Sequence, residues 1–233
     1  MKILVIGAAG DVGRGLVFAA AERGWAVAAA GRSADTLEAI AAAYPAGKVV
    51  PVVGSVADPA AARALLDASK AALGGLDAVV VSVNAAKGMR PLLDWTPDEL
   101  LATLDGNVIT HFNALGAALA VLGPQGVFIG IGGGMADFIV PGNVHASMAQ
   151  AALRMMYRGA AKEQPDRLIR ELQVVAMVDG ESTRAIADDT WLKAEEIGRH
   201  ACAMIERPGE FAGPVIPLRR QDPVGVPPPP KNR

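Results

Sequence analysis

Several features that would define a protein class at once are scarce in this 233-residue sequence. The single cysteine, Cys202, cannot form an internal disulfide or a cysteine zinc site, and this cysteine usage fits a reducing cytoplasm. No run of 18 uninterrupted apolar residues occurs, which excludes a spanning helix. The formal net charge of −2 and the absence of a dense basic block argue against a nucleic-acid or anionic-membrane partner. We therefore expect a cytoplasmic protein.

The residues that are present favour an apolar globular chain, since 52% are hydrophobic and 20% are charged. Short runs rich in Val and Ile alternate with longer Ala and Leu stretches of helical period, a pattern typical of βα units around a parallel sheet. The run after Met1 and Lys2 is too short for a secretion signal, so we interpret it as a buried strand. Strands are expected at residues 2–6, 26–30, 49–53, 77–83, 126–131, 172–178 and 214–218.

Helix-start signals support this alternation. Ser33 and Asp58 are suited to be N-caps, and the segment 96–99, Thr-Pro-Asp-Glu, combines an N-cap, proline at the first helical position and a carboxylate at the third. The predicted architecture is α/β, one doubly wound parallel sheet of the Rossmann type, over residues 1–218. Residues 219–233 contain four consecutive prolines and are expected to form an extended tail, either a frayed terminus or a proline-motif ligand.

A glycine-rich turn directly follows the first expected strand and opens a helix. Glycines permit a tight turn and the close approach of a pyrophosphate, and the free N–H groups at the helix start attract its charge. This context indicates a nucleotide site rather than a merely structural turn. The cofactor-binding residues predicted in it are Gly7, Gly10, Asp11, Val12 and Gly13.

The end of the second strand indicates which dinucleotide binds. An acidic residue there would hold a ribose 2′-hydroxyl, whereas a basic residue would accept a 2′-phosphate. The sequence has Arg32 and Ser33 at this point and no acid, which favours NADP over NAD. Alternatively, Ser33 is only a helix cap and Arg32 only a solvated side chain.

At these residues the sequence resembles the short-chain dehydrogenase/reductase family, from Met1 to about Leu218. The resemblance implies a nicotinamide-dependent oxidoreductase, with Asn84 and Thr183 at the cofactor and Asn107 in catalysis. It also implies a homo-oligomer, a dimer or tetramer, formed through the long helices expected at 96–122 and 143–163. The resemblance to the family rests on Gly7, Gly10 and Gly13, the segments 55–58 and 83–86, Asn107 and the segment 178–183.

The family's catalytic pattern is incomplete in this sequence. Gly133 stands where the family has serine, and Ala146 and Gln150 stand where it has the tyrosine and lysine of Tyr-x-x-x-Lys. Tyr157 and Lys162 are not a substitute, because a separation of five residues turns two helical side chains roughly 140° apart. Gln150 can still donate to ribose hydroxyls, but it has no charge with which to depress a neighbouring acid's pKa.

His145 precedes the missing tyrosine and is the best replacement general acid, although a merely structural histidine is an equally good interpretation. His111 lies one helical turn after Asn107 and either approaches the same pocket or packs against a neighbouring helix. Asp137 could pair with a histidine or be solvated. The three histidines are widely spaced and lack paired acidic ligands, so no metal site is predicted.

Two functions remain open from the sequence. The first is an atypical NADP(H)-dependent oxidoreductase that transfers hydride to a hydrophobic carbonyl, enone or quinone, of which quinones and activated enones suit it best because they need little acid assistance. The second is a non-catalytic dinucleotide-binding protein, a redox sensor or partner subunit. A hydrophobic small-molecule substrate is suggested by the apolar residues expected near the nicotinamide, Met135, Phe138, Ile139 and Met148.

Overall fold

A seven-stranded parallel sheet forms the centre of the computed structural model, which describes residues 1–85 and 88–229. The strand order is β3-β2-β1-β4-β5-β6-β9. Strands β1 to β3 are added toward one edge of the sheet and β4 to β9 toward the other, so the strand order reverses between β1 and β4. The strands are β1 (Lys2–Ile6), β2 (Ala26–Gly31), β3 (Val49–Val53), β4 (Ala78–Val81), β5 (Val127–Gly133), β6 (Leu168–Val175) and β9 (Val215–Arg219). Two further short strands, β7 (Val178–Asp179) and β8 (Leu192–Lys193), pair with each other.

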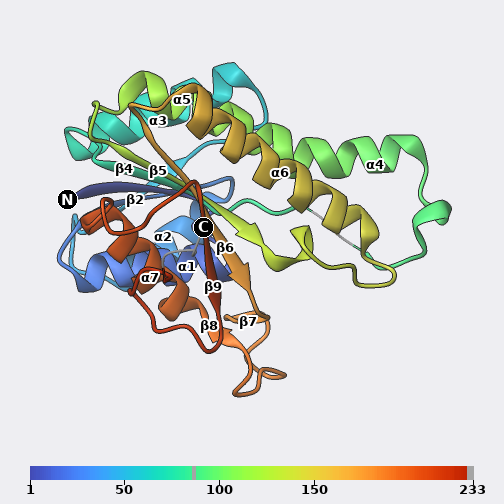
Figure 1. Ribbon diagram of the computed structural model, residues 1–233. Coiled ribbons are helices and arrows are strands. Elements are labelled where there is room, and N and C mark those ends of the chain that lie inside the picture. Colours follow the sequence, from blue (N-terminus) through green and yellow to red (C-terminus); the bar gives the residue numbers. More distant parts are fainter. Residues whose placement is uncertain (86–87, 230–233) are drawn as a thin grey trace.

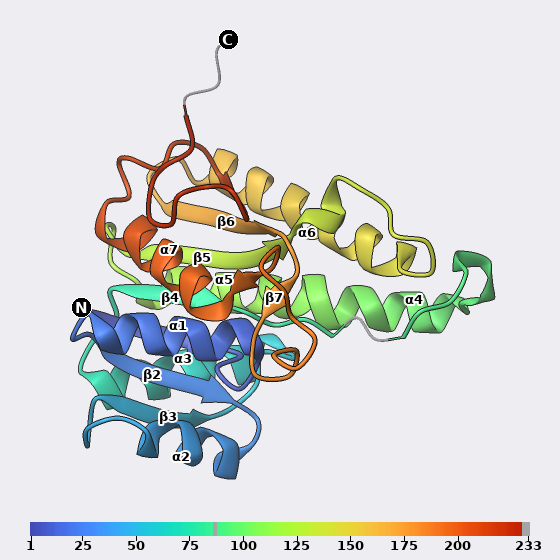
Figure 2. The ribbon, with the colours of Figure 1, turned by 90° about the horizontal axis from the view of Figure 1, so that it is seen from below.

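Helices cover both faces of the sheet (Figure 1). One face carries α1 (Asp11–Glu22), α2 (Ala34–Ala42) and α7 (Ala194–Glu206), and the other carries α3 (Pro59–Leu73), α5 (Thr110–Val121) and α6 (Val144–Glu163). In Figure 2, α4 (Pro97–Leu104) projects beyond the sheet beside the first turns of α6. Three short turns complete the list, η1 (Leu92–Asp94), η2 (Asp105–Ile109) and η3 (Gly134–Ala136). The predicted doubly wound α/β fold in one domain is confirmed.

The apolar runs of the sequence become strands that are buried on both faces. In β1, Ile3 and Val5 belong to the core beneath α1 and α7, whereas Leu4 and Ile6 belong to the core beneath α3, α5 and α6. Alternate side chains of a strand point to opposite faces, so a central parallel strand needs apolar residues at every position.

The predicted helix starts are confirmed. The Ser33 hydroxyl accepts a hydrogen bond from the Thr36 N–H, and the Asp58 carboxylate accepts one from the Ala61 N–H. Thr96 and Glu99 form a reciprocal capping box at the start of α4. Each cap satisfies backbone donors that the first helical turn leaves without a partner.

Some predicted boundaries are wrong. The strand expected at 77–83 ends at Val81, and the strand expected at 172–178 runs instead from Leu168 to Val175. The helix expected at 96–122 is interrupted by the π-helical turn η2, which separates α4 from α5. Neither β7 nor β8 was expected as a separate pair. Ala86, in the segment that resembles the family's Asn-Asn-Ala-Gly, and the last four residues of the expected tail lie outside the described residues.

Residues that follow β9 contact α7. The Gly225 N–H donates to His200 Nδ1 over 3.1 Å, and Arg207 donates to the Gly225 carbonyl over 2.6 Å. Residues 227–229 have neither helix nor strand structure. Among the described residues, none of the helices has the length and apolar character needed to cross a membrane.

Candidate functional site

The turn between β1 and α1 requires glycine at two positions. Gly7 has φ +85°, and a Cβ there would lie 2.2 Å from the Ser82 carbonyl oxygen. A Cβ on Gly13 would lie 2.0 Å from the Gly7 carbonyl oxygen. The turn is held by N–H groups of Gly7 and Ala8, which both donate to the Ala30 carbonyl over 3.0 Å. The result is a tight backbone cradle, residues 7–13, that excludes side chains at Gly7 and Gly13 and fits a pyrophosphate.

The start of α1 presents N–H groups with no side-chain cap. Its N-cap residue is Gly10, which has no side chain to accept a hydrogen bond from the helix. By contrast, the N-cap side chains of α2, α3 and α4 all accept such a bond; these residues are Ser33, Asp58 and Thr96. Free N–H groups and the helix dipole together favour an anion at such a position. Gly10, Asp11, Val12 and Gly13 therefore lie where the sequence predicted a phosphate site.

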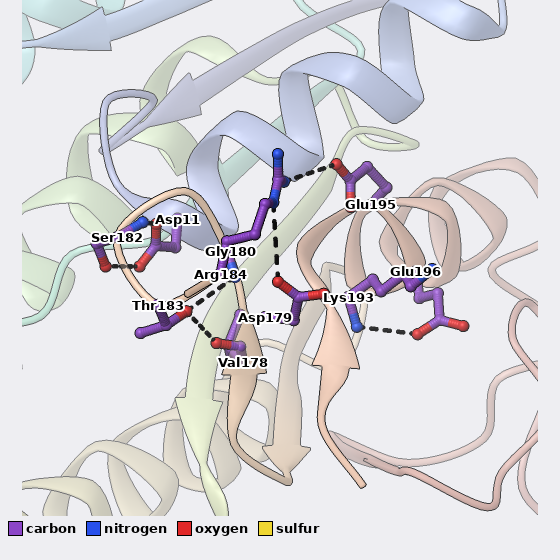
Figure 3. A network of polar contacts seen from close by, with 10 residues as sticks. All are labelled: Asp11, Val178, Asp179, Gly180, Ser182, Thr183, Arg184, Lys193, Glu195 and Glu196. Carbon is purple, nitrogen blue, oxygen red and sulfur yellow. Dashed lines mark hydrogen bonds and ion pairs between the residues drawn. The ribbon is translucent and has the colours of Figure 1, made fainter. Parts of the chain in front are cut away.

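Asp11 points away from its own helix start, toward the loop between β7 and β8 (Figure 3). Its carboxylate accepts hydrogen bonds from the Ser182 N–H over 2.9 Å and from the Ser182 hydroxyl. An ion pair of 2.8 Å between Arg14 and Glu181 adds a second link. Loop 180–191 is thus fastened to the first turn of α1, beside the glycine cradle.

Thr183 stabilises this loop from within (Figure 3). Its hydroxyl donates to the Val178 carbonyl over 2.7 Å and accepts from the Gly180 N–H over 3.0 Å. Arg184 lies 3.9 Å from carboxylate oxygens of both Asp179 and Glu195. The predicted cofactor residue Thr183 therefore has hydrogen-bond partners inside its own loop in this structure.

A cavity of about 180 Å³ lies at the carboxyl ends of β4, β5 and β6. It brings together three predicted cofactor residues, Val12, Asn84 and Gln150, from three distant parts of the sequence. In open parallel sheets the crevice at the carboxyl ends, at the point where the strand order reverses, is the usual ligand site. The lining residues are Val12, Ser82, Val83, Asn84, Ile131, Gly132, Gly133, Gln150, Val174, Ala176 and Val178.

Gln150 reaches this cavity from α6. Its Oε1 atom accepts a hydrogen bond of 2.7 Å from the Gly133 N–H, at the end of β5. The bond orients the amide and leaves its NH₂ group as the donor that a ribose hydroxyl would need. Gly133 and Gln150, which lie 17 residues apart in the sequence, thus contact each other at the cavity.

Arg32 and Ser33 follow β2, on the other side of β1 from the cavity. Both are exposed, and the Ser33 hydroxyl lies 2.9 Å from the Thr36 hydroxyl as well as capping α2. They do not line the cavity. A ligand that contacted both regions would have to cross the glycine cradle, as a dinucleotide does.

Asn107 is buried in the π-helical turn, with 1% of its surface exposed. Its amide donates to the Thr103 carbonyl over 2.7 Å, and its Oδ1 accepts from the Ala85 N–H over 3.3 Å. In this structure Asn107 supports the segment after β4, next to Asn84 of the cavity. It is not a lining residue itself.

His145 is buried beneath Trp95 and does not line the cavity. The two rings stack with centroids 4.0 Å apart, and the Arg90 guanidinium lies over the indole ring, 4.0 Å from its centroid. Neither ring nitrogen of His145 has a hydrogen-bond partner among the described residues. Burial, and secondarily the charge of Arg90, lowers the His145 pKa below its ordinary value, so the neutral form predominates at pH 7.

His111 and Tyr157 form a buried pair behind the cavity wall. The Tyr157 hydroxyl lies 2.6 Å from His111 Nδ1, and His111 Nε2 lies 2.9 Å from the Val83 carbonyl oxygen. A carbonyl can only accept, so Nε2 carries the proton and Nδ1 accepts from tyrosine. Burial lowers the His111 pKa to about 4 and raises the Tyr157 pKa well above its ordinary value. Lys162 is exposed, so it does not join Tyr157.

Glu171 is an ionisable residue next to the site that the sequence analysis missed. Its side chain in β6 is fully buried, and burial raises its pKa to about 7. Arg154 Nε is 4.0 Å away, but Arg154 also forms a two-pronged ion pair with Asp137, which holds the Asp137 pKa at about 2. The strand expected at 172–178 left Glu171 outside, whereas β6 begins at Leu168 and includes it.

The described residues contain no cluster of three or more His, Cys, Asp or Glu side chains that could hold a metal ion. Asp137 is paired with Arg154 and accepts a hydrogen bond from Gln173 over 2.9 Å, rather than pairing with a histidine.

Comparisons with known proteins place residues 7–218 in a family described as enoyl-(acyl carrier protein) reductase. A double mutant of a Serratia marcescens short-chain dehydrogenase/reductase is 25% identical, with a TM-score of 0.83 over 93% of this chain and 95% of that one. An alcohol dehydrogenase from the archaeon Thermococcus sibiricus, complexed with 5-hydroxy-NADP, is 24% identical, with a TM-score of 0.81 over 96% and 99%. A dehydrogenase/reductase from Sinorhizobium meliloti is 21% identical, with a TM-score of 0.78 over 95% of each chain. Comparison with curated proteins found no match.

Proposed function

This chain belongs to the short-chain dehydrogenase/reductase family, and we propose that it is a cytoplasmic NADP(H)-dependent oxidoreductase. The observation that carries the proposal is the glycine cradle leading into the cavity at the carboxyl ends of β4, β5 and β6. The start of α1 would hold the pyrophosphate, with β2 on the side of the adenosine half and the cavity on the side of the nicotinamide half. When bound, the nicotinamide supplies hydride chemistry, and Asn84 and Gln150 hold and orient the ribose and ring beside it.

The proposed preference for NADP rests on the end of β2. Arg32 is exposed there, and the side chain of neighbouring Ser33 already faces the start of α2. A guanidinium forms a charge-assisted pair with a 2′-phosphate, and an adjacent hydroxyl adds a second donor. Ser33 can serve as cap and ligand together when the Thr36 hydroxyl donates to it, because its oxygen then only accepts from Thr36 and its own proton can turn toward the phosphate.

The active site is proposed to be atypical, since Gly133, Ala146 and Gln150 occupy the positions of the family's serine, tyrosine and lysine. A site without that relay suits substrates whose reduction needs little acid assistance, such as enones and quinones. Phe138, Ile139 and Met148 expose apolar surface near the start of α6, which supports a hydrophobic substrate.

The proton is proposed to come from His145 or from water. The lowered pKa of His145 leaves little imidazolium at pH 7, so an activity that depends on it should increase as the pH falls below its ordinary titration range. His145→Ala should then lower kcat by roughly 10²-fold or more while cofactor affinity barely changes. A loss of thermal stability with an unchanged pH profile would assign His145 a structural role in the stack with Trp95.

The second candidate is a dinucleotide-binding protein without catalysis, favoured by the missing relay. Calorimetry with NADPH, followed by a stopped-flow screen of NADPH oxidation against quinones, enones and ketones, separates the two. Binding with turnover of any substrate supports the oxidoreductase. Micromolar binding, worth about 8 kcal/mol, without turnover would support the sensor or partner subunit. No binding would overturn both.

A homo-oligomer is proposed as the working form. Large apolar side chains are exposed along α4, η2 and α5 and along α6, and burial of such surface is the usual driving force of association. Phe112→Glu should therefore shift the mass measured by light scattering toward the monomer. An unchanged mass would exclude this face. The exposed residues are Leu101, Ile109, Phe112, Met148 and Met155.

A further inference from the structure

We propose that Glu171 couples nicotinamide binding to proton release, its carboxylate favouring the oxidised, cationic ring and its neutral acid form favouring the reduced ring. The inference rests on the proposed function, because it requires that the cavity accept the nicotinamide half of a dinucleotide. It applies equally to an enzyme and to a redox sensor, since it concerns only binding.

The position of Glu171 relative to the cavity carries the argument. Gly132 lines the cavity, and a Cβ on Gly132 would lie 2.0 Å from Glu171 Oε1. The carboxyl group therefore occupies the space that a side chain at position 132 would take, directly against the wall of the cavity. Only the backbone of a glycine stands at this point of the wall.

The carboxyl group has no competing hydrogen bonds. Neither oxygen of Glu171 has a hydrogen-bond partner within residues 1–85 and 88–229, although both are buried, and the charge facing them is Arg154 Nε at 4.0 Å. A buried carboxylate without hydrogen bonds is costly, so a positive charge brought into the adjacent cavity stabilises it more than it would a solvated group. The oxidised nicotinamide ring carries such a charge, and the reduced ring does not.

The surrounding groups leave Glu171 as the residue of this cluster that titrates near neutral pH. Arg154 is cationic throughout, and Asp137 is ionised because its pKa is about 2. Tyr157, which packs against Gly130 of the neighbouring strand β5, and its partner His111 are neutral, because burial raises the tyrosine pKa and lowers the histidine pKa to about 4. Burial places the Glu171 pKa at about 7. Near pH 7 the neighbouring groups therefore keep their charge while Glu171 changes its own.

The test is the ratio of the dissociation constants of NADP⁺ and NADPH, measured between pH 5.5 and 8.5. Both cofactors share the 2′-phosphate and the pyrophosphate, so titration of those groups cancels in the ratio. We expect the dissociation constant of NADP⁺, divided by that of NADPH, to fall on the order of tenfold as the pH rises through about 7. A tenfold change corresponds to about 1.4 kcal/mol, which is within the range for two opposite charges a few ångströms apart near a protein surface. Calorimetry at pH 7 in two buffers of different ionisation enthalpy should show proton release with NADP⁺ only.

Two variants assign the effect to Glu171. Glu171→Gln keeps the shape of the neutral acid and should make the ratio independent of pH. Asp137→Asn removes a like charge and frees Arg154 to pair with Glu171, so the change in the ratio should move to lower pH. Glu163→Gln, an exposed carboxylate in the last turn of α6, is the matched control and should behave as the wild type.

A wild-type ratio that stays constant with pH would overturn the inference while leaving the proposed function intact, and this measurement holds even if Glu171→Gln fails to fold. A pH-dependent ratio that persists in Glu171→Gln, or that Asp137→Asn leaves unmoved, would also overturn it. Absence of binding by either cofactor would overturn the proposed function and the inference together.

Discussion

Adding a single Cβ atom to a glycine has its largest steric effect where two stretches of backbone lie close together. At Gly13 a single Cβ would meet the Gly7 carbonyl at 2.0 Å, whereas at Gly159, in the middle of α6, it would meet no neighbouring atom within 4 Å. The same substitution therefore has opposite consequences at two helical positions. At Gly13 steric repulsion dominates, and at Gly159 the gain in helix propensity dominates.

We expect Gly13→Ala to abolish NADPH binding by displacing the cradle, and Gly159→Ala to leave binding unchanged while adding about 0.5–1 kcal/mol of stability. Calorimetry and thermal unfolding of the two variants measure these effects. Circular dichroism controls for loss of the fold in Gly13→Ala. Full affinity in that variant would place the phosphate elsewhere.

Arg32 provides the second residue-scale prediction. Arg32→Ala should weaken NADPH by roughly 1–3 kcal/mol, the range for a hydrogen bond to a charged group, and leave NADH nearly unchanged. Arg63→Ala, which removes an exposed arginine from α3, is the matched control. Equal losses for NADPH and NADH would refute the assignment of the 2′-phosphate site.

At the scale of elements, the sequence predicted those features that depend on neighbouring residues. Apolar runs located the seven strands of the large sheet, and the caps at Ser33, Asp58 and Thr96 located three helix starts. Features that depend on distant partners were missed. The strand β6 begins at Leu168, which pairs with Val127 of β5. Arg170 within it is buried with the Phe211 and Pro208 carbonyls as partners, which no local pattern could reveal.

The candidate site divides in the same way. Gly7, Asn84 and Gln150 were found through motifs, and the structure places the first in the cradle and the other two at the cavity. The partner of Asp11 was not predictable, because Ser182 lies 171 residues away in the sequence. The burial of Glu171 was likewise hidden, since it depends on α6 packing over β5 and β6.

The link between Asp11 and Ser182 predicts the behaviour of the loop as an element. Asp11→Ala removes both hydrogen bonds, so the Ser182 amide should exchange with deuterium on the order of tenfold faster, the effect of losing about 1.4 kcal/mol. The comparison is Asp67→Ala, an exposed carboxylate of α3. If exchange at Ser182 stayed at the wild-type rate, other contacts, such as the ion pair between Arg14 and Glu181, would be holding the loop.

At the scale of the whole molecule, the ionisable groups make the stability of the fold depend on pH in opposite directions. Salt bridges at the surface hold the pKa values of Asp137 and Glu99 at about 2, so their contribution to stability is lost only as the pH falls toward that value. The buried histidines His111 and His200 have pKa values lowered to about 4, so acid destabilises the fold between about 6.5 and 4. Glu171 has the opposite effect: because its pKa is raised, the stability that it contributes is lost as the pH rises.

The pH dependence of stability isolates that last contribution. Glu171 has an ordinary pKa of 4.5 when unfolded and about 7 when folded, so the stability it contributes is complete below pH 4.5 and is lost as the pH rises through 7. The loss should amount to about 3 kcal/mol. We therefore expect Glu171→Gln to unfold in urea much like the wild type at pH 5 but to be more stable by up to that amount at pH 8. The histidines and surface carboxylates are common to both proteins and cancel in the difference. An equal difference at pH 5 and pH 8 would mean that Glu171 keeps one charge state across this range, and that the cavity wall holds no titrating group.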